Sequence, residues 1–538
     1  MLAFSRVCEQ ISATTKKLQK EQILSEYLRS LSDEDLAIAC VFLSGYTFSL
    51  RDQRKTNVGF AVVRDAILEI QPGGEEKLAS LLIQTGDLGT AVAQLFSDNS
   101  ASRRLSLSDV MSYFAQLTST TSNLEKRRLT LDVLNRAEPL EAKYILKILL
   151  GGMRIGLQES LVESSVAKAF QRPLQAVQRA NMLLGDVGET AILAKYDRLA
   201  EATMRLLHPL KLMLASPEED TDRILKYMDG IGLAEDKYDG IRAQVHKQGK
   251  QIKIYSRDLI EVTQAFPDIV EAMSVIPDSF LMDGEIVPFK DGKILSFGEL
   301  QTRLGRKALS TEILQSVPCR YFAFDLLYQN GELLLETPLS ARRERLEQVQ
   351  RSWPSAFSLA VQTMVSKTAE VEAAFEAARG RNNEGLVIKH PGSVYTPGKR
   401  GKQWLKLKRA LLTLDVVVTR AEYGHGKRAG LLSDYTFAVQ QDGRYLTIGK
   451  AYSGITDEEL LQLSDLFHKI SLGNEGYYHN VPLQVVLEVT FDRINRSDRH
   501  TSGFALRFPR IKRIRLDKTP EEVDTLETVQ NLYETHFK

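Results

Sequence analysis

Cysteine is scarce in this chain of 538 residues, which contains Cys8, Cys40 and Cys319. They are too few and too widely spaced for a disulfide framework or a CxxC zinc site, so we expect reduced thiols. The sequence also lacks an apolar run long enough to span a bilayer, and its first residues lack the basic-then-apolar pattern of a signal peptide. These absences disfavour a secreted or membrane-spanning protein and predict a cytoplasmic one.

A large excess of charge of either sign is absent too. The formal net charge is +1, although 26% of the residues are charged. Any surface that binds nucleic acid must therefore be local rather than a property of the whole chain. No internal repeat or low-complexity tract is evident, and the length predicts several domains, each large enough for its own core.

The hydrophobic period changes twice along the chain. Up to about residue 207, apolar residues recur at helical spacing, as in "LSDEDLAIACVFLSG", where Ser32 is placed to cap a helix. Between about residues 208 and 411, short alternating segments with hairpin turns dominate, and helical segments such as "TAEVEAAFEAARG" lie between them. From residue 412, short strands and one helical segment are typical of a small Greek-key barrel.

We therefore predict a multidomain fold. It comprises an all-α domain over residues 1–207, an α+β domain over residues 208–411 and an OB-fold β-barrel over residues 412–538. Within the α+β domain, the sequence predicts hairpin turns at Gly249, Asp291-Gly292 and Asn330-Gly331, because glycine and asparagine tolerate the backbone angles that tight hairpins need.

Charged residues occur on several expected strands of the middle domain. In "WLKLK", a side-chain period of two places Lys406 and Lys408 on one face with the tryptophan, opposite the two leucines. In "LMDGEIV", Asp283 and Glu285 share one face, and "NEGLVIKH" begins another strand at Glu384. Each charge alone fits an edge strand that faces solvent, since these residue types are mostly exposed. Together they predict a cavity lined with cations and carboxylates.

The order of the motifs resembles a known family. Along the chain, "KYDGIR" beginning at Lys237, "SRD", "DGE", "FAFDLLY", "EGLVIK" and "WLKLK" resemble the signature series of the ATP-dependent DNA ligases. That family belongs to the covalent nucleotidyltransferases, together with RNA ligases and mRNA capping enzymes. "LLGGMRIGL" resembles the helical DNA-binding domain of the larger DNA ligases, and "GFALRFPRIKRIRLDK" resembles their C-terminal motif in an OB domain. The resemblance covers essentially the whole chain.

The resemblance implies a nick-sealing reaction through a lysine-AMP intermediate, with Lys237 as the catalytic nucleophile and ATP as the cofactor. A lysine amine attacks phosphorus only when unprotonated, and nearby cations and partial burial favour that form. The resemblance also implies the nucleotide contacts: Glu235 beside the exocyclic edge of adenine, Phe324 stacked on adenine, Arg242 and Arg257 on ribose and phosphate, Glu285 on the ribose hydroxyl or metal, and Lys406 and Lys408 on the phosphates. Glu285 and Glu384 would hold Mg²⁺ (or Mn²⁺), a hard cation that prefers oxygen ligands.

The C-terminal motif has two interpretations. By resemblance, the barrel closes over the nucleotide, so that Arg510 and Lys518 reach the departing pyrophosphate and Asp517 orients one of the cations. The alternative is a basic strand that only touches DNA, as OB folds commonly do.

DNA binding has separate support in the sequence. The glycines of "GGMRIGL" permit close backbone approach, and Arg154 among them suits a phosphate or minor-groove contact, although a helix C-cap with one exposed arginine explains them equally well. Lys399 and Arg400 add to a local positive surface. The expected partner is nicked double-stranded DNA, bound without regard to sequence because backbone contacts carry no base information. We expect a monomer in a prokaryotic cytosol or nucleoid; replication, repair and recombination all stay open, and no sliding-clamp peptide is identifiable.

Competing interpretations are weaker. "GHGKRAG" at residues 424–430 resembles a phosphate loop, but Arg428 stands where that loop needs Ser or Thr, so we predict an ordinary turn. NAD-dependent ligases carry a four-cysteine zinc module that three dispersed cysteines cannot build. An RNA ligase or capping-type nucleotidyltransferase is the nearest alternative, which the helical first third disfavours, and a catalytically silent DNA-binding scaffold is an alternative of a different class.

Overall fold

The structure is a computed structural model that describes residues 1–97, 105–295, 297–304, 306, 309–350, 356–407 and 412–537. The chain divides into two compact units. The first unit consists of Met1–Arg6, Thr56–Arg154 and Ala410–Lys538, and the second of Val7–Lys55 and Ile155–Arg409.

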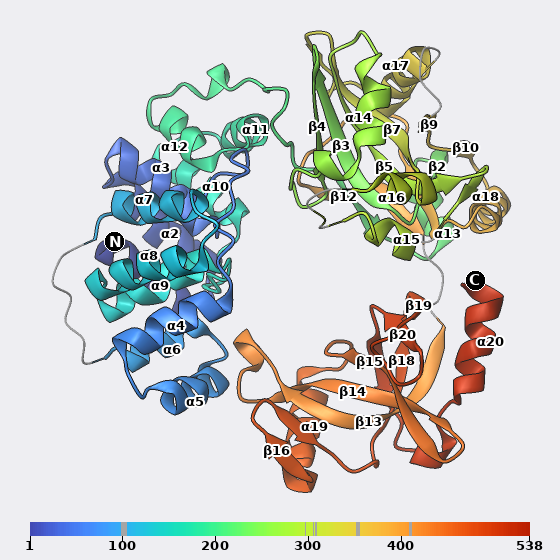
Figure 1. Ribbon diagram of the computed structural model, residues 1–538. Coiled ribbons are helices and arrows are strands. Elements are labelled where there is room, and N and C mark those ends of the chain that lie inside the picture. The colour runs from blue at the N-terminus through green and yellow to red at the C-terminus, as the bar shows by residue number, and fades with distance from the viewer. Residues whose placement is uncertain are drawn as a thin grey trace. The chain divides into compact units, whose positions relative to one another are not determined.

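The first part of the chain is helical, as predicted (Figure 1, blue to green). Its elements are α1 (Leu2–Ser12), α2 (Lys17–Arg29), α3 (Asp33–Leu43), α4 (Phe60–Ile70), α5 (Glu75–Thr85), α6 (Leu88–Leu95), α7 (Leu107–Thr118), α8 (Asn123–Arg136), α9 (Pro139–Leu149), α10 (Glu159–Ala169), α11 (Leu174–Leu184), α12 (Val187–Lys195) and the 3₁₀ turn η1 (Leu199–Glu201). Ser32 caps α3 as predicted, because its hydroxyl accepts a hydrogen bond from the Asp35 N–H at 3.2 Å.

The helices pack in pairs within each unit. In the first unit α6 packs on α9 and α4 on α8, and in the second α2 packs on α10 and α3 on α12. The interior is built by aliphatic and aromatic residues such as Phe42, Ile67 and Tyr144, all fully buried. Burial of these faces supplies most of the stability of such short helices.

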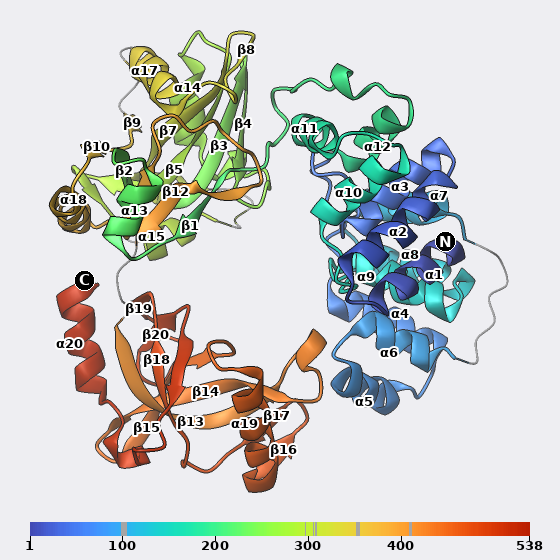
Figure 2. The same cartoon turned by 180° about the vertical axis from the view of Figure 1, so that it is seen from behind.

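The middle of the chain forms two sheets (Figures 1 and 2). The first sheet has the order β1-β12-β11-β2-β10 and is covered by α13 and α18. Its elements are β1 (Leu214–Pro217), α13 (Thr221–Tyr227), β2 (Gly232–Lys237), β10 (Gln362–Val365), α18 (Thr368–Gly380), β11 (Gly385–Lys389) and β12 (Arg400–Leu407). The helix predicted over "TAEVEAAFEAARG" is α18, so this prediction is confirmed.

The second sheet has the order β4-β3-β5-β7-β8, with β6 paired to β5 and β9 paired to β7. Its elements are β3 (Ile241–Gln248), β4 (Gln251–Ser256), η2 (Thr263–Ala265), α14 (Pro267–Ser274), β5 (Phe280–Lys290), β6 (Lys293–Ile294), α15 (Phe297–Gln301), α16 (Thr311–Ser316), β7 (Cys319–Gln329), β8 (Glu332–Leu333), α17 (Leu339–Gln350) and β9 (Phe357–Leu359). The three predicted hairpin turns join β3 to β4, β5 to β6 and β7 to β8, and Gly249, Gly292 and Gly331 all have positive φ.

A shared core joins the two sheets of the middle region. It contains Trp404 from β12, Leu281 from β5, Leu327 from β7 and Tyr395 from the loop between β11 and β12. Leu405 and Leu407 belong to a different cluster under α18, so the two faces predicted for "WLKLK" are confirmed for the described part of that strand. Burial of both faces fixes the register of β12, because a slip of one residue would exchange them.

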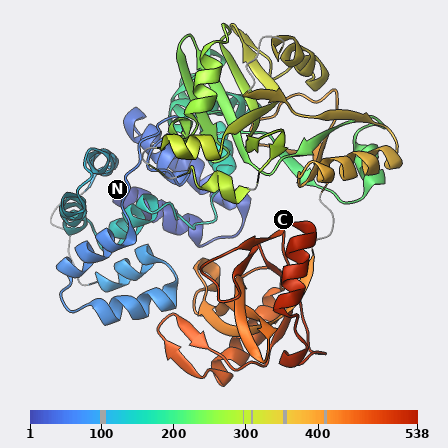
Figure 3. The same ribbon diagram turned by 45° about the vertical axis from the view of Figure 1, so that its right-hand side comes forward.

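The C-terminal region is rich in strands, as predicted (Figure 3, orange to red). Its elements are β13 (Thr413–Tyr423), η3 (Gly426–Arg428), β14 (Leu432–Gln441), β15 (Arg444–Ala451), α19 (Asp457–Ile470), β16 (Gly473–Glu475), β17 (Tyr478–Asn480), β18 (Val486–Thr490), β19 (Arg493–Arg496), β20 (Phe504–Arg507), β21 (Arg510–Ile514), η4 (Pro520–Glu522) and α20 (Leu526–His536).

These strands close on themselves around one core. Strands β15, β14, β13, β18 and β21 pair in that order, and the Ile511 N–H of β21 donates to Ser453 O, just after β15, at 2.8 Å. Phe437 and Val489 are among the buried core residues. The "GHGKRAG" segment forms the connection from β13 to β14, with η3 inside it, so it is a turn as predicted.

The buried ion pair between Arg342 of α17 and Asp325 of β7 generates a stability prediction. Both side chains are fully buried, and the guanidinium donates to the carboxylate at 2.7 and 2.9 Å. Replacing Arg342 with Met should lower the free energy of unfolding by about 3–5 kcal/mol, because an uncompensated carboxylate stays buried. Urea denaturation followed by tryptophan fluorescence reports on this region, since Trp404 is buried in its core.

Arg345 on the same helix provides the control. Its ion pair with Glu332 at 2.6 Å is exposed, so Arg345→Met should change the denaturation midpoint little. Equal losses in the two variants would contradict a dominant role for the buried pair.

Candidate active site

Lys237 stands at the end of β2, in the interior of the first sheet. Its partner in the ladder is Gly385, the first residue of β11, and the Glu384 N–H donates to Lys237 O at 2.8 Å. The Lys237 ammonium forms an ion pair with the Glu384 carboxylate, and both side chains are between a fifth and a quarter exposed. The amine is therefore fixed in place but reachable from solvent.

The glycine of "KYDG" permits the chain to turn closely against β5. A Cβ atom on Gly240 would lie 2.3 Å from Ile286 O, which no side chain can accommodate. Gly385 is constrained as well, because its φ is +150° and a Cβ atom would lie 2.4 Å from Leu407 O. Gly240 thus lets the turn after β2 lie against β5, and Gly385 lets the start of β11 lie against β12.

Glu285 of β5 belongs to the same group of charges. It lies opposite Arg242 in the ladder between β3 and β5. Desolvation raises the pKa of the Glu285 carboxyl to about 8, against the opposing attraction of Lys237 and Arg242, and Glu384 adds to the rise by repulsion. Side chains from three strands thus meet here, as the polar pattern of these strands predicts.

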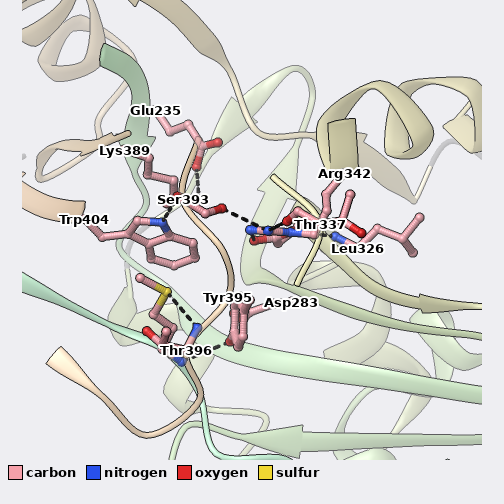
Figure 4. A network of polar contacts seen from close by, with 12 residues as sticks. Glu235, Asp283, Leu326, Thr337, Arg342, Lys389, Ser393, Tyr395, Thr396 and Trp404 are labelled. Atoms are coloured by element: carbon pink, nitrogen blue, oxygen red, sulfur yellow. Dashed lines mark hydrogen bonds and ion pairs between the residues drawn. The ribbon is translucent and has the colours of Figure 1, made fainter. Parts of the chain in front are cut away.

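Asp283 holds Arg242 in place. The Asp283 carboxylate is fully buried and receives the Arg242 guanidinium as a fork, with Nε–Oδ1 at 3.1 Å and Nη2–Oδ2 at 2.7 Å. The Tyr395 hydroxyl donates to Asp283 Oδ2 at 2.6 Å and accepts from the Met213 N–H at 3.0 Å (Figure 4). Sequence reasoning missed Tyr395, because nothing in the loop between β11 and β12 marks its partner.

Glu235 lies in a second buried ion pair, with Lys389 of β11. The Oε2–Nζ distance is 2.5 Å and both side chains are almost fully buried (Figure 4). The Lys389 ammonium lies 4.2 Å from the ring centre of Phe324 and 4.1 Å from that of Trp404. Glu235 and Phe324 are therefore brought together by Lys389, to which the sequence reasoning assigned no role although it ends the "EGLVIK" motif.

The remaining nucleotide contacts expected from the sequence lie at varied positions. Arg257 is exposed in the turn after β4, and Lys406 is partly buried on β12. Lys408 lies outside the described residues. Arg510 is exposed at the start of β21 in the C-terminal domain, and Asp517 forms an ion pair with Arg515 at 2.8 Å.

The residues that we expect to bind DNA lie at the surface or close to it. Arg154 has a φ of +48°, and its guanidinium donates to Gly86 O at 2.7 Å while its side chain stays nearly half exposed. Gly151 follows the end of α9 with a φ of +70°, the usual conformation of a helix C-cap. Lys399 and Arg400 are exposed where β12 begins.

Two carboxylates near Lys237 are suitable donors for a divalent cation. Among the described residues, no group of three or more histidine, cysteine, aspartate and glutamate side chains is arranged to hold a metal by itself. Glu285 and Glu384 supply carboxylate oxygens, the ligand type that Mg²⁺ prefers; this cation takes one or two carboxylates and completes its coordination with water and substrate phosphates.

Comparison with known proteins covers all three regions. Residues 1–167 match the family described as DNA ligase N terminus, residues 212–408 that described as ATP dependent DNA ligase domain, and residues 428–518 that described as ATP dependent DNA ligase C terminal region. A "Probable DNA ligase" of Koribacter versatilis (strain Ellin345) is 42% identical over 560 residues, which cover 100% of this chain and 97% of that protein. The chain belongs to the ATP-dependent DNA ligases. A "DNA ligase" of Methanococcoides burtonii is 34% identical, over 98% of each chain.

The solved structures agree in fold. A ligase structure named "Pmar-Lig_PreS3" is similar with a TM-score of 0.64, covering 95% of this chain and 99% of that chain at 16% identity. Membership of the family means that this ligase uses ATP and acts on nicked duplex DNA. The alternatives of an RNA ligase, a capping enzyme and a silent scaffold are thereby set aside. In the described part of the ligase, no helix is both long and apolar enough to cross a membrane.

The raised pKa of Glu285 generates a prediction for the ligase without nucleotide or metal. A carboxyl with a pKa of about 8 in the folded state and about 4.5 in the unfolded state binds its proton more tightly when folded. Its contribution to stability therefore falls as the pH rises from about 4.5 to about 8 and is level above that. Glu285→Gln lacks this loss, so its Tm relative to the wild type should be higher at pH 8.5 than at pH 5. A Tm difference that is equal at both pH values, by scanning calorimetry, would contradict the raised pKa.

Proposed function

We propose that Lys237 is the nucleophile with which this ligase forms enzyme-AMP. The observation that carries the proposal is the placement of its amine at the end of β2, partly exposed, against Glu384 and close to Glu285. The Nζ atom forms a bond to the α-phosphorus of ATP, the bond to the bridging oxygen breaks, and pyrophosphate leaves with the electron pair. The amine attacks only after it has lost its proton, and the Glu384 carboxylate that it contacts can accept this proton.

The rest of the reaction transfers AMP and seals the nick. The 5′-phosphate of the nick attacks the phosphorus of Lys237-AMP and releases the lysine, which gives a DNA-adenylate. The 3′-hydroxyl then attacks the 5′-phosphorus, and AMP leaves as the strands join. Because the transferred groups carry negative charge in loose transition states, positioning and electrostatic stabilisation supply most of the catalysis.

The same proposal extends to the nucleotide contacts. Phe324 stacks on adenine and Glu235 faces the exocyclic edge of the base, which fits their joint contact with Lys389. Arg242, held by Asp283, and the exposed Arg257 contact ribose and phosphate. Lys406 and Lys408 contact the phosphates, and Glu285 contacts the ribose hydroxyl or the metal.

Glu285 and Glu384 would hold Mg²⁺, or Mn²⁺ in its place, together with the substrate. When bound, this cation neutralises negative charge that develops on the phosphates. The closeness of the Glu285 and Glu384 carboxyls supports the assignment, because a cation bound to both offsets the repulsion between them.

DNA is held through its backbone by basic residues, for which Arg154, Lys399 and Arg400 are the candidates. Their exposure supports the assignment of Lys399 and Arg400, whereas Arg154 has to leave Gly86 O to reach a phosphate with the same nitrogen. The monomeric state and the cytoplasmic location of the ligase stay predictions. Its role in replication, repair or recombination is a prediction as well.

Substitution of Lys237 tests the central assignment. Lys237→Ala should abolish the covalent AMP adduct, detected by mass spectrometry after incubation with ATP, because no other amine takes its place. The affinity for DNA should stay nearly unchanged, because the substitution removes one lysine of the site and leaves the basic surface intact. Lys253→Ala removes a lysine of β4 that pairs with Glu261 at 3.2 Å, and this control should keep the adduct. An AMP adduct on Lys237→Ala would refute the assignment.

A comparison of reaction steps tests the role of the C-terminal motif. Arg510→Ala and Lys518→Ala should slow formation of enzyme-AMP, from which pyrophosphate leaves, yet spare the sealing of a nick that already carries 5′-AMP. Single-turnover rates of the two steps decide between the two interpretations of the motif. Slow sealing with normal adenylylation would show that these residues only bind DNA.

A further inference from the structure

The basic tail of the C-terminal domain, residues 510–518, lies over carboxylates that sequence reasoning did not single out. Asp415, near the start of β13, receives the Arg515 guanidinium at 2.9 and 3.0 Å and the Lys518 ammonium at 2.6 Å. The Asp415 side chain is only 12% exposed and Arg515 13%. One buried carboxylate thus joins two cations of the tail.

A second carboxylate repeats this arrangement one strand away. Glu488 of β18 lies 2.8 Å from the Lys512 ammonium and 2.6 Å from the Arg513 guanidinium. Its side chain is 8% exposed, whereas Lys512 and Arg513 remain more than half exposed. The hydrogen bonds from these two cations lower the pKa of the Glu488 carboxyl to about 2, so it is ionised across the physiological range.

Asp415 and Glu488 are direct neighbours in the sheet. They are register partners in the antiparallel ladder between β13 and β18. Like charges directly opposite one another destabilise a sheet, so this acidic pair does not serve the pairing of the two strands. It is balanced instead by the cations of the tail, with Arg515 also bound to Asp517 at 2.8 Å.

We propose that Asp415, together with Glu488, is a positioning residue that holds the cations of the basic tail in the geometry required when pyrophosphate leaves ATP. The proposal rests on the proposed role of this tail in forming enzyme-AMP. Lysine and arginine side chains lose much rotamer freedom when they are held in one geometry. Ion pairs with a rigid strand impose that loss during folding, so the cations need not reorganise as charge develops on the leaving group.

If the carboxylates acted only through their charge, their removal would have the opposite effect to the loss of a positioning residue. Removing a negative charge from beneath a basic surface makes its potential more positive and should strengthen the binding of any anion. A positioning role predicts that loss of the carboxylate weakens the one step that needs aligned cations. The sign of the change therefore separates the two explanations.

The test compares two reactions of one preparation of enzyme-AMP. Asp415→Asn, which keeps the shape of the side chain, is loaded with AMP and then mixed either with pyrophosphate, which regenerates ATP, or with nicked DNA. Discharge by pyrophosphate should be about 10-fold to 100-fold slower than in the wild type, because misplaced groups forfeit this much rate. Transfer to DNA from the same preparation, and sealing of a pre-adenylylated nick, should be nearly unchanged. The ratio of the two discharges does not depend on the fraction of protein that is folded.

Glu422→Gln is the matched control. Glu422 stands at the other end of β13 and pairs with Lys450 at 2.9 Å, so this variant makes the same change of charge on the same strand without touching the tail. It should leave both discharges unchanged. Glu488→Gln should slow the pyrophosphate step selectively, and it carries the test if Asp415→Asn cannot be purified.

Two outcomes would overturn the proposal. One is a pyrophosphate discharge that is as fast as in the wild type, or faster, in both Asp415→Asn and Glu488→Gln. The other is an equal slowing of all steps, which indicates general structural damage. Lys518→Ala, measured beside them, shows whether the proposed role of the tail itself holds. If discharge by pyrophosphate is slow in Lys518→Ala and normal in Asp415→Asn, the role of the tail stands and only the positioning role of Asp415 is refuted.

Discussion

A buried carboxylate, Asp283, connects the parts of the site that come from different sheets. It binds Arg242 of the neighbouring strand as a fork and accepts the hydroxyl of Tyr395 from the loop between β11 and β12. A charge that is fully buried costs several kcal/mol unless such partners compensate it, so its partners have little freedom to move. The loop joins β11, which begins directly after Glu384, to β12, which contains Lys406. Asp283 thereby couples the sheet of Lys237 to the sheet of Glu285.

The same principle of paired charges recurs around the proposed nucleotide site. Lys237 is paired with Glu384, Lys389 with Glu235 and Arg242 with Asp283, before any substrate is present. Each cation is held without a net surplus of positive charge in the interior. This balance supports the proposal that ATP enters as a complex with a divalent cation, which offsets the negative charge of the phosphates. The C-terminal tail differs, because Lys512 and Arg513 are paired with Glu488 yet stay exposed and available to an anion.

Much of the fold was predictable because it depends on local patterns. The helical period, the Ser32 cap and the turns at Asp291-Gly292 and Asn330-Gly331 are set by residues close together in the chain, and all are confirmed. The assignment of two faces to "WLKLK" needed only the two-residue period of a strand. The motif order led to the family without any knowledge of how the strands pair. The partner of each charged side chain was not predictable in this way, since it depends on strand order.

The sequence by itself determined the classes of structure along the chain, the family and the candidate nucleophile Lys237. These follow from short-range periodicity and from motifs of a few residues. Only the tertiary structure decided that Tyr395 binds Asp283, 112 residues away, and that Lys518 binds Asp415, 103 residues away. Lys389 and Glu235 likewise meet through the pairing of β2 with β11. Such contacts arise from sheet topology and register, which bring distant segments together, and no local pattern in the sequence encodes which carboxylate a given cation will reach.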